Sequence, residues 1–575
     1  MRRIITLILL ICFSIDVFTQ EFKFGGNLGN WVHDWVIDMD LTSDGSIILS
    51  TDNQARYWDT NGFIPEETFY GLTKIDKAGK VAWYFDFFRT SFDYHEYSIA
   101  QTVLDESDNI YSLIYVYQKT NADIINGITY YPGLNLVKIS PQGKVIWIKD
   151  IGTTDDMGAS ILYKNGHIYV LCLYQGDLTL ESTRKFSSQK YYQCFQWTYE
   201  QGTDYLMTKY DTEGNLMNAV SFGEDYPDIA IDATIDNDEN IYFLGVSDYF
   251  GGCANAYSHI TKVDKNLNIV WKKVTSLQTN NNGLFNATNI HYSANNKIYV
   301  WGNIYNKITT EDYTLIRDCG TTGGDFSSCL LEFNSSTGNY FRKMQLNSCS
   351  TTFTQGSSDD FRRHFVNGYM TDFDNNLLIH TAFVGTLNIG DTTIMSSYYT
   401  DTYNYNLQNM LLLKVDVENL TPKYINTFSG AFNSYYLDFP GKILTDNKNN
   451  LYLSGTFSEN PIYINNDSIG NNSGNGCYDV LYCKFGLEKL LSDTKEIYPN
   501  NDEFILYPNP CTNFLKYRYK DKVDKIQIFN MIGTMIRECE INNSVLDIHD
   551  LEPNSYILLF YKDNKIISRK VIVKK

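Results

Sequence analysis

The chain has 575 residues, of which 43% are hydrophobic, so it has ample material for a core and is long enough for two to four domains. It is acidic, because 67 Asp and Glu outnumber 47 Lys and Arg, and its formal net charge is −20. No basic stripe stands out, which argues against nucleic acid and anionic lipid as partners. The 45 Tyr and 33 Phe, with only 11 Pro, are typical of a β-rich protein.

The N-terminus has the pattern of a secretory signal peptide. Met1-Arg2-Arg3 is a basic start, residues 4–13 form an apolar run, and polar residues follow. The run is too short to span a bilayer. We predict a signal peptide at residues 1–19, with cleavage near Thr19 or Gln20; the alternative is a buried first strand. No later stretch has the uninterrupted apolar length of a membrane helix, so we expect no transmembrane segment in the mature chain.

One pattern recurs seven times after the signal peptide. A polar turn is followed by an aliphatic anchor residue, which in five of the seven copies precedes a tyrosine. Each turn carries Asn, Asp or Gly, the residues that supply positive φ in hairpins at low cost. The anchor residues are Ile47, Ile110, Ile168, Ile241, Ile298, Leu377 and Leu451.

A second element follows each anchor. It reads apolar-x-Lys-apolar-Asp, as in residues 72–76 and 260–264, with degenerate copies at 330–334 and 482–485. A further turn then leads to a fourth strand. Four strands in each of seven copies predict an all-β fold in which residues 20–491 form a seven-bladed β-propeller. The fourth strand is often centred on a tryptophan, as at Trp83, Trp147 and Trp271.

These units resemble a bacterial β-propeller repeat. In that family one blade ends in a Trp strand and Gly-Gly, and the next opens with Asp, a D-x-D-G-N turn and a Val-Tyr strand. The seventh unit has no convincing fourth strand after Phe485, whereas residues 22–26 resemble the fourth strand at 220–223 that precedes Asp228. We therefore predict that the N-terminal strand completes the last blade, which removes an open sheet edge.

Three long, aromatic-rich insertions fall between the second and third strands of their blades, at 52–71, 176–202 and 390–408. In an up-and-down blade these connections lie at one end of the ring. Loops on a rigid scaffold are frequent binding sites, and exposed Tyr and Trp suit protein or sugar surfaces. We predict a binding face here; the alternative is that the aromatics pack together to fold their own loops. The candidates are Tyr57, Trp58, Tyr191, Tyr192, Trp197, Tyr199, Tyr398, Tyr399 and Tyr403.

A second set of candidates lies where the innermost strands begin, near the mouth of the central channel. Four of the seven positions are Asp, and a ring of carboxylates could bind a cation or carry out acid–base chemistry. The alternative, which repetition among the blades favours, is that each Asp caps its own loop through a side-chain-to-backbone bond. A histidine breaks the repeat at one position. The candidates are Asp34, Asp155, Asp228, His364 and Asp438.

No catalytic or metal motif stands out elsewhere. Residues 236–240 have the oxygen spacing of a calcium loop, but Ile241 replaces the required Gly and no Glu follows at the twelfth position, so we predict a plain hairpin turn. We predict no cofactor and no metal, and we assign no catalytic residue. After Cys12 leaves with the signal peptide an even number of cysteines remains, for which structural disulfides or buried thiols are expected.

The end of the chain has a different pattern. A polar linker at 492–503 precedes short apolar runs that alternate with Asn-, Gly- and Asp-bearing turns, the spacing of a small antiparallel Ig-like sandwich. Prolines near its start indicate the end of a first strand, because they cannot donate a ladder hydrogen bond. The residues that define the pattern include Tyr507, Pro508, Asn509, Pro510, Gly533 and Lys570.

Residues 504–575 closely resemble the type A C-terminal sorting domain of the bacterial type IX secretion system. The resemblance implies cargo of a Bacteroidota-type Gram-negative cell, with the type IX machinery as a partner and a location outside the cell or on its outer surface. Such cargo usually loses the tail when it is released or attached.

Together these features predict a secreted or cell-surface β-propeller. We expect a non-catalytic, adhesin-like module that binds a glycan or protein ligand of unknown identity. The alternative is a polysaccharide-degrading enzyme, a glycosidase or lyase, that works at the mouth of the channel. A purely structural role at the cell surface is a third alternative.

Overall fold

The structure is a computed structural model, and the residues that it describes form strands, turns and irregular connections with no helix among them. The described residues are 18–28, 33–54, 68–90, 97–116, 123–125, 128–152, 159–181, 183–193, 198–223, 227–247, 257–277, 285–304, 307–316, 327–349, 367–384, 386–389, 392–395, 398–399, 405–406, 408–428, 438–458, 462–464, 467–469, 478–489, 505–507, 511–518, 523–530, 535–540, 545–562 and 565–574.

The chain divides into two compact units. The first unit comprises Lys23–Lys484. The second comprises Met1–Phe22 together with Phe485–Lys575. The two boundaries fall inside two neighbouring strands of one sheet, which are the first and the last strand of that sheet in chain order.

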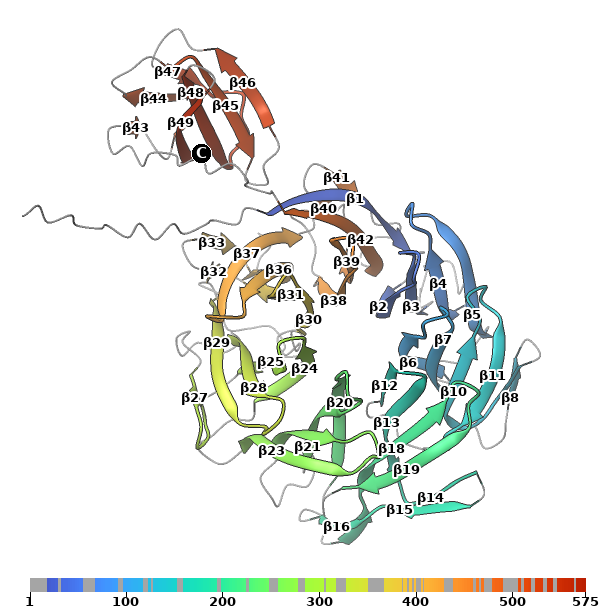
Figure 1. Cartoon of the computed structure of the whole chain (residues 1–575). Helices are drawn as coiled ribbons and strands as arrows, with labels where there is room; N and C mark the ends of the chain where they lie inside the picture. The colour runs from blue at the N-terminus through green and yellow to red at the C-terminus, as the bar shows by residue number, and fades with distance from the viewer. Residues whose placement is uncertain are drawn as a thin grey trace, which may run out of the picture. The chain divides into compact units, whose positions relative to one another are not determined.

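The first unit is a ring of antiparallel sheets (Figure 1). Its described strands form seven units of four strands, which we number blades 1 to 7 in chain order. The first strands of successive blades contact one another around the ring, and the first strand of blade 7 contacts that of blade 1. The predicted all-β, β-propeller class is therefore confirmed.

In each blade the chain runs from the inner strand to the outer strand. The strands are β2 (His33–Leu41), β3 (Ile47–Gln54), β4 (Thr68–Ile75) and β5 (Val81–Thr90) in blade 1; β6 (Tyr97–Leu104), β7 (Ile110–Val116), β10 (Gly133–Ile139) and β11 (Val145–Asp150) in blade 2; β12 (Ala159–Lys164), β13 (His167–Gln175), β18 (Thr203–Asp211) and β19 (Leu216–Phe222) in blade 3; β20 (Asp228–Ile235), β21 (Ile241–Ser247), β22 (Tyr257–Val263) and β23 (Ile269–Leu277) in blade 4; β24 (Asn286–Ser293), β25 (Lys297–Ile304), β28 (Ser327–Asn334) and β29 (Tyr340–Cys349) in blade 5; β30 (Tyr369–Phe373), β31 (Asn376–Val384), β36 (Gln408–Asp416) and β37 (Thr421–Phe428) in blade 6; and β38 (Phe439–Thr445), β39 (Asn450–Ser458) and β42 (Tyr478–Lys489) in blade 7.

The fourth strand of blade 7 is the N-terminal strand β1 (Phe18–Leu28), which lies next to β42. The Phe24 ring of β1 packs on Gly79 in the outer turn of blade 1, where an added Cβ would come within 2.7 Å of the ring. Asn27 Nδ2 donates a hydrogen bond of 2.8 Å to Asp479 Oδ2 of β42. The first described strand of the chain therefore covers the edge that β42 would otherwise expose.

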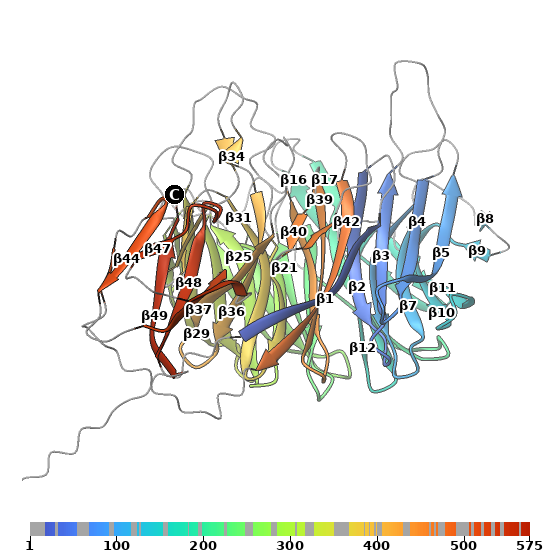
Figure 2. The ribbon, with the colours of Figure 1, turned by 90° about the horizontal axis from the view of Figure 1, so that it is seen from above.

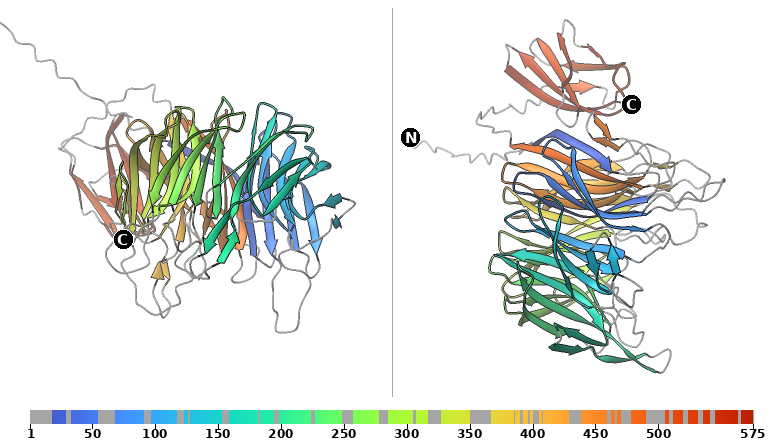
Figure 3. Two further views of the ribbon diagram at one scale, coloured as in Figure 1. Left: turned by 90° about the horizontal axis from the view of Figure 1, so that it is seen from below. Right: turned by 90° about the vertical axis from the view of Figure 1, so that its right-hand side faces the viewer.

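The second strand of a blade is the most deeply buried. Every residue of β7 and β21 is buried, whereas the outer strand β11 is half-buried or exposed along its length. The cause is that the blades stack side by side, so that neighbouring blades cover both faces of the middle strands (Figure 3). Strands covered on both faces read as nearly continuous apolar runs rather than alternating ones.

The repeated Tyr, Lys and Trp residues connect each blade to the next. In blade 2, Tyr111 Oη donates to Asp105 Oδ2 of its own turn at 3.0 Å, and Lys138 Nζ lies 5.3 Å from the centre of the Tyr111 ring. Lys138 Nζ and Trp147 Nε1 then both donate to the carbonyl of Thr212, in the outer turn of blade 3, at 2.8 and 3.3 Å. The Lys–Tyr contact recurs in Lys209 over Tyr169, Lys262 over Tyr242 and Lys484 over Tyr452.

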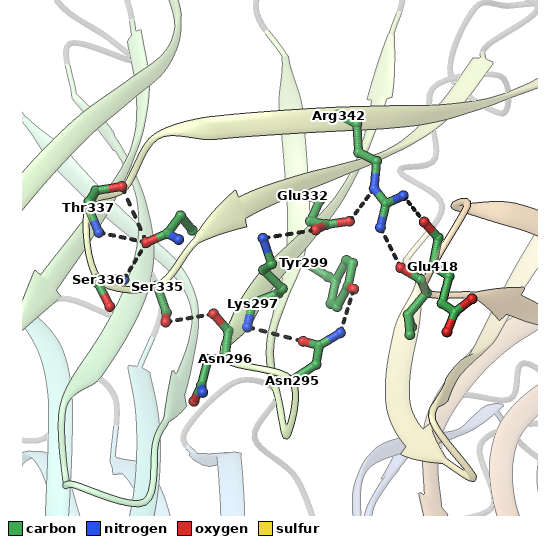
Figure 4. A network of polar contacts seen from close by, with 12 residues as sticks. Asn295, Asn296, Lys297, Tyr299, Glu332, Ser335, Ser336, Thr337, Arg342 and Glu418 are labelled. Carbon is green, nitrogen blue, oxygen red and sulfur yellow. Dashed lines mark hydrogen bonds and ion pairs between the residues drawn. The ribbon is translucent and has the colours of Figure 1, made fainter.

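Blade 5 keeps this connection with different charges (Figure 4). Glu332 stands at the lysine position, and its side chain is only 1% exposed. Its carboxylate accepts hydrogen bonds from Arg342 Nε at 2.7 Å and pairs with Lys297 Nζ at 3.4 Å. The two terminal nitrogens of Arg342 donate to the carbonyls of Val417 and Glu418, in the outer turn of blade 6. The degenerate copy of the motif is therefore charge-compensated.

The insertions fold as small hairpins, several of which lie around the outside of the ring, such as β14–β15 at residues 177–187 (Figure 1). Each hairpin lies between the second and third strands of its blade, and apolar residues such as Leu178, Ile308 and Leu387 bury against the blades. The hairpins are β8 (Asp123–Ile125) with β9 (Ile128–Tyr130), β14 (Asp177–Leu180) with β15 (Arg184–Ser187), β16 (Lys190–Gln193) with β17 (Thr198–Gln201), β26 (Ile308–Thr309) with β27 (Thr314–Leu315), β32 (Thr386–Ile389) with β33 (Thr392–Met395), β34 (Tyr398–Tyr399) with β35 (Tyr405–Asn406), and β40 (Ile462–Ile464) with β41 (Asp467–Ile469).

The C-terminal part of the second unit contains two sheets around one core. The core residues include Ile526, Ile528, Leu558 and Phe560, all fully buried. One sheet contains β43 (Ile505–Tyr507), β44 (Phe514–Arg518) and β47 (Val545–Asp547); the other contains β46 (Met535–Glu540), β45 (Lys525–Asn530), β48 (Ser555–Lys562) and β49 (Lys565–Val573).

Five cysteines of the described residues carry free thiols. Cys172, Cys329 and Cys483 are fully buried in the propeller, Cys511 is buried in the C-terminal domain, and Cys539 is half-buried there. Burial raises the pKa of the Cys172, Cys329 and Cys483 thiols, which keeps them protonated and unreactive. The buried-thiol alternative therefore describes these three.

Glycine in an outer turn makes room for the tryptophan of the preceding blade. Gly338 has φ +71°, and a Cβ there would lie 2.8 Å from the Trp271 ring. Gly166 has φ +78° with nothing near its Cβ position, so it is a matched control. We expect Gly166→Ala to cost about 1–2 kcal/mol for the left-handed backbone alone, and Gly338→Ala to cost about 1–3 kcal/mol more because the ring must move. Chemical denaturation measures both, and equal losses would contradict the packing role of Gly338.

Candidate functional site

A cavity of about 740 Å³ lies in the central channel of the propeller. All seven inner strands contribute to its wall, so the cavity lies between them. Most of the wall is aliphatic, and its polar residues occupy related positions on different blades. The polar residues that matter below are Asp38, Gln101, Asp232, Asn289, Tyr369 and Lys442.

The polar residues of the wall are placed there by irregularities in the inner strands. An extra residue in one strand bends it locally and re-aims a side chain. The register between inner and second strands shifts between Val36 and Asp38, Ile99 and Gln101, Ala230 and Asp232, Ala287 and Asn289, and Pro440 and Ile443.

These side chains connect one inner strand to the next. Asp38 Oδ2 of blade 1 accepts a hydrogen bond of 2.9 Å from the backbone N–H of Thr102 in blade 2. The three parallel contacts are Gln101 Oε1 with Ile161 N at 2.8 Å, Asp232 Oδ2 with Ile290 N at 3.0 Å, and Asn289 Oδ1 with Gly368 N at 3.0 Å. The channel wall is therefore held by side-chain-to-backbone hydrogen bonds between blades.

Between blades 7 and 1 an ion pair takes the place of such a bond. Lys442 Nζ of blade 7 lies 2.8 Å from Asp38 Oδ1 and 3.8 Å from Asp40 Oδ1 of blade 1. Burial would lower the pKa of Lys442, but the two carboxylates raise it above its usual value, so the side chain is charged at neutral pH. Removing either partner of a buried ion pair leaves an uncompensated charge.

Asp40, beside Lys442, and Asp232, in the cavity wall, have perturbed pKa values. Burial raises the pKa of Asp40 to about 7, because it outweighs the attraction of Lys442, and Asp38 raises it further. Burial also raises the pKa of Asp232 to about 6, although the N–H groups of Ile290 and Ala233 lower it. Asp40 is thus a carboxyl group beside Lys442 of the cavity wall, and its pKa lies near neutral pH.

The predicted channel-mouth residues lie at the starts of inner strands. Asp34 is the second residue of β2, Asp228 begins β20 and Asp438 immediately precedes β38, and all three are buried. Asp228 Oδ1 accepts a hydrogen bond of 2.5 Å from Ser247 Oγ. None of the three contributes to the cavity wall. Asp155 and His364 lie outside the described residues.

The sequence analysis missed the residues that do line the cavity. The missed residues follow the predicted channel-mouth positions by four places, as Asp38 follows Asp34, Asp232 follows Asp228 and Lys442 follows Asp438. The sequence feature that could have indicated them is a polar residue inside an otherwise apolar inner strand. It was hidden because the register shift disrupts the strict alternation expected of a strand.

Part of the predicted aromatic face lies on two hairpins. Tyr192 of β16 is the register partner of Tyr199 of β17, and Tyr399 of β34 is the partner of Tyr405 of β35. Figure 2 shows both hairpins at the same end of the ring. Tyr191 and Tyr398 lie on β16 and β34, whereas Tyr57, Trp58, Trp197 and Tyr403 lie outside the described residues.

The turn at residues 236–240 uses its acidic side chain within the hairpin. Asp236 accepts hydrogen bonds from the backbone N–H of Asp238 and of Asn240, from the Asn240 amide, and from Tyr242 Oη at 2.9 Å. This is the geometry of a plain hairpin turn. In the part of the chain that the structure describes, no three or more His, Cys, Asp or Glu side chains cluster as a metal site would require, and no helix could span a membrane.

Comparison with known families identifies the C-terminal domain. The strand topology defines two classes of domain, a β-propeller and a small domain of two sheets. Residues 505–574 match the model of the secretion system C-terminal sorting domain. The predicted sorting domain is thereby confirmed, and with it the predicted export of the chain to the cell surface or into the medium.

The chain is only weakly similar to solved structures, and no curated protein matches its sequence. A Bacteroides caccae protein of unknown function has 10% identity and a TM-score of 0.28, over 57% of this chain and 94% of its own. The endosialidase of phage phi92 has 9% identity and a TM-score of 0.38, over 96% and 87% of the two chains. The polysaccharide lyase Uly1 has 9% identity and a TM-score of 0.40, over 81% and 100%.

The raised pKa of Asp40 predicts a characteristic pH dependence of stability. A carboxyl group with a raised folded pKa holds its proton more tightly in the folded protein, so the wild type gains stability as pH falls from above 7 toward 4. The Asp40→Asn variant lacks this group. We expect it to unfold with a higher free energy than the wild type at pH 8, and the difference to vanish near pH 4, in urea denaturation.

Asp44 is a control of opposite sign. Its hydrogen bond with Thr42 lowers the pKa of this carboxyl group to about 2, so it stabilises the fold above pH 4 and loses that effect as pH falls. Asp44→Asn should therefore be less stable than the wild type at pH 8. A difference for Asp40→Asn that stays constant from pH 8 to pH 4 would contradict the burial of an ionised Asp40.

Proposed function

We propose that this protein is a signal-peptide-bearing cargo of the type IX secretion system in a Bacteroidota-type cell, and that its propeller binds an extracellular glycan or protein without chemical turnover. The main support for a non-catalytic function is that the acidic side chains of the channel wall accept hydrogen bonds from the protein itself. Asp38 and Asp232 each accept hydrogen bonds from the backbone of the next blade. These carboxylates therefore hold the ring together.

Glycoside chemistry needs two acids with distinct and available roles. One protonates the leaving group, and the other attacks or activates water across an open site. In the described channel Asp38 bonds the backbone N–H of Met39 and of Thr102 and pairs with Lys442. Asp40 alone is left to act as an acid or base. Because both carboxyl groups of the cavity wall, Asp38 and Asp232, are bonded to the protein, we favour a structural channel over a catalytic one.

The binding face is proposed at the end of the ring that carries the β16–β17 and β34–β35 hairpins. The residues that repeat among the blades, such as Lys138 and Trp147, connect neighbouring blades. The hairpins, in contrast, are insertions that differ from blade to blade. In each of these two hairpins, two tyrosines are register partners across the strands. Tyrosine gives a large contact area with few rotatable bonds, which suits both sugar rings and protein surfaces.

The alternative is an enzyme, and one observation favours it. The pKa of Asp40 is raised to about 7, where a general acid or base works best at neutral pH, and the cavity beside it has about 740 Å³. A propeller glycosidase or lyase would then use Asp40 next to the cavity. The binding experiment below separates this alternative from the proposed function.

Export should depend on the sorting domain. Deletion of residues 505–574 removes the matched family domain and leaves the propeller strands in place. We expect the truncated protein to accumulate in the periplasm and the full chain to appear in the medium or on the cell surface, as measured by fractionation and immunoblotting. A control that lacks residues 1–19 should stay in the cytoplasm. Undiminished export of the truncated protein would contradict the proposed role of the tail.

Binding should depend on the tyrosine hairpins. The mature protein is screened against arrays of neutral and acidic polysaccharides, and the best probe is titrated against Tyr192→Ser and Tyr399→Ser variants. We expect at least a tenfold loss of affinity, because a buried aromatic contact contributes about 1–3 kcal/mol. Tyr84→Ser is the control, since Tyr84 is 62% exposed on the outer strand of blade 1. Depolymerisation of the probe that disappears in Asp40→Asn would instead establish the enzyme.

A further inference from the structure

The larger sheet of the C-terminal domain is apolar on both of its faces. Its strands lie in the order β46, β45, β48 and β49 (Figure 1). Successive side chains of a strand point to opposite faces of the sheet. In β48, Tyr556, Leu558 and Phe560 are buried in the domain core, whereas Ile557 and Leu559 are half-buried and point the other way. A sheet with one solvated face normally carries polar residues there, so this outer face is unusual.

The outer apolar residues of neighbouring strands lie beside one another. Phe529 of β45 is the register partner of Ile557 on one side and of Met535 of β46 on the other. Directly opposite residues of an antiparallel pair share a face, with Cβ atoms about 4.5–5.5 Å apart. Phe529 is half-buried, and Met535 is 51% exposed at the edge of the sheet. We call Phe529, Met535, Ile557 and Leu559 the outer patch.

The polar side chains next to the outer patch are already paired within the sheet. Lys525 Nζ lies 3.2 Å from Glu538 Oε2, and Gln527 Nε2 donates to the same oxygen at 2.5 Å. Tyr561 Oη donates to Gln527 Oε1 at 2.7 Å. A partner on this face would therefore meet apolar side chains beside a cluster whose one positive and one negative charge balance. Such a face suits an apolar contact surface, because the centres of interfaces are poor in unpaired charge.

The other outer surfaces of the domain are less suited to docking. On the smaller sheet Phe514 lies opposite Asp547, and Val545 lies opposite Lys516, so each exposed apolar residue has a charged neighbour. The edge strand β46, with the sequence MIRECE, carries three charged residues, which discourage the addition of another strand. Within the described part of the domain, the outer patch is therefore the better docking surface.

We propose that the outer patch is where a protein of the type IX export machinery docks on the sorting domain. The match of residues 505–574 to a sorting domain supplies the partner, because such a domain acts by being recognised. The inference rests on the export function proposed above, and it adds the surface and its chemistry. The contact surface of the partner is apolar and carries few charges.

The size of the face fits a contact that forms and then releases. Four strands about 4.8 Å apart, with a rise of about 3.3 Å per residue, give the sheet a face on the order of 400 Å². That area is below the standard size of stable interfaces and is typical of transient encounters. A cargo protein that must leave the machinery after export needs a partner of this kind.

The test replaces patch residues in the full-length protein, expressed in a cell that exports it. Phe529→Thr and Ile557→Thr are combined, because threonine keeps the strand preference and removes apolar surface. We expect the exported amount to fall about tenfold or more, with the protein retained in the periplasm, because a few central contacts dominate binding at interfaces. Fractionation and immunoblotting measure export, and thermal unfolding of the purified protein measures folding.

Two variants are controls. Phe514→Thr changes a residue that is 55% exposed on the outer face of the smaller sheet, and it should be exported as the wild type is. Ile557→Val keeps the patch apolar and should also be exported normally. If the double variant does not fold, Met535→Thr takes its place in the same assay, because an exposed position on the edge strand tolerates the change.

Three results would overturn the inference. The first is normal export of a folded patch variant, and the second is an equal loss of export for Phe514→Thr. The third is a dimer of the wild-type protein in light scattering that dissociates in the double variant, which would assign the patch to a second copy of the chain. Deletion of residues 505–574 in the same assay tests the export function separately. If that deletion also leaves export unchanged, the export function fails and the inference fails with it.

Discussion

The hydrogen bonds that Lys138 and Trp147 make to the carbonyl of Thr212 represent the constraint on which the propeller depends. A single blade has two apolar faces and cannot bury both alone, so each repeat needs its neighbours. Apolar stacking alone would allow blades to slide. In blade 2 the lysine and tryptophan donors fix the outer turn of blade 3, and the Asp105 turn holds Tyr111 beneath Lys138. Stability and geometry therefore come from the same residues.

A second set of connections acts at the inner edge of the ring. Asp38, Gln101, Asp232 and Asn289 each reach the backbone of the next inner strand, and Lys442 joins blade 7 to blade 1 through an ion pair, so five of the seven junctions have such a contact. These contacts hold neighbouring blades together at both their inner and outer edges. The residues that repeat from blade to blade therefore have structural roles. Variation is left to the connections between second and third strands. This division of roles explains why the proposed binding face lies there and not in the channel.

The sequence predicted what depends on local pattern. The turn before Tyr242 and the lysine motif at 260–264 defined strands and fold class, because hairpin chemistry and apolar periodicity are local. The cavity wall was not predicted, since Asp38 and Lys442 meet only when blades 1 and 7 become neighbours. The free, buried Cys172 was compatible with the sequence, but its burial depends on packing between blades.

Ring closure has a consequence for the timing of folding. Asn27 bonds Asp479 across 452 positions, so the seventh blade joins the beginning of the propeller to its end. Contacts of such separation form late, after the entropy of a very long loop has been lost. The sorting domain starts soon after β42, at residue 505. A polypeptide long enough to carry the sorting domain is therefore already long enough to close the ring, whereas one that terminates before β42 lacks both the closing strand pair and the sorting domain.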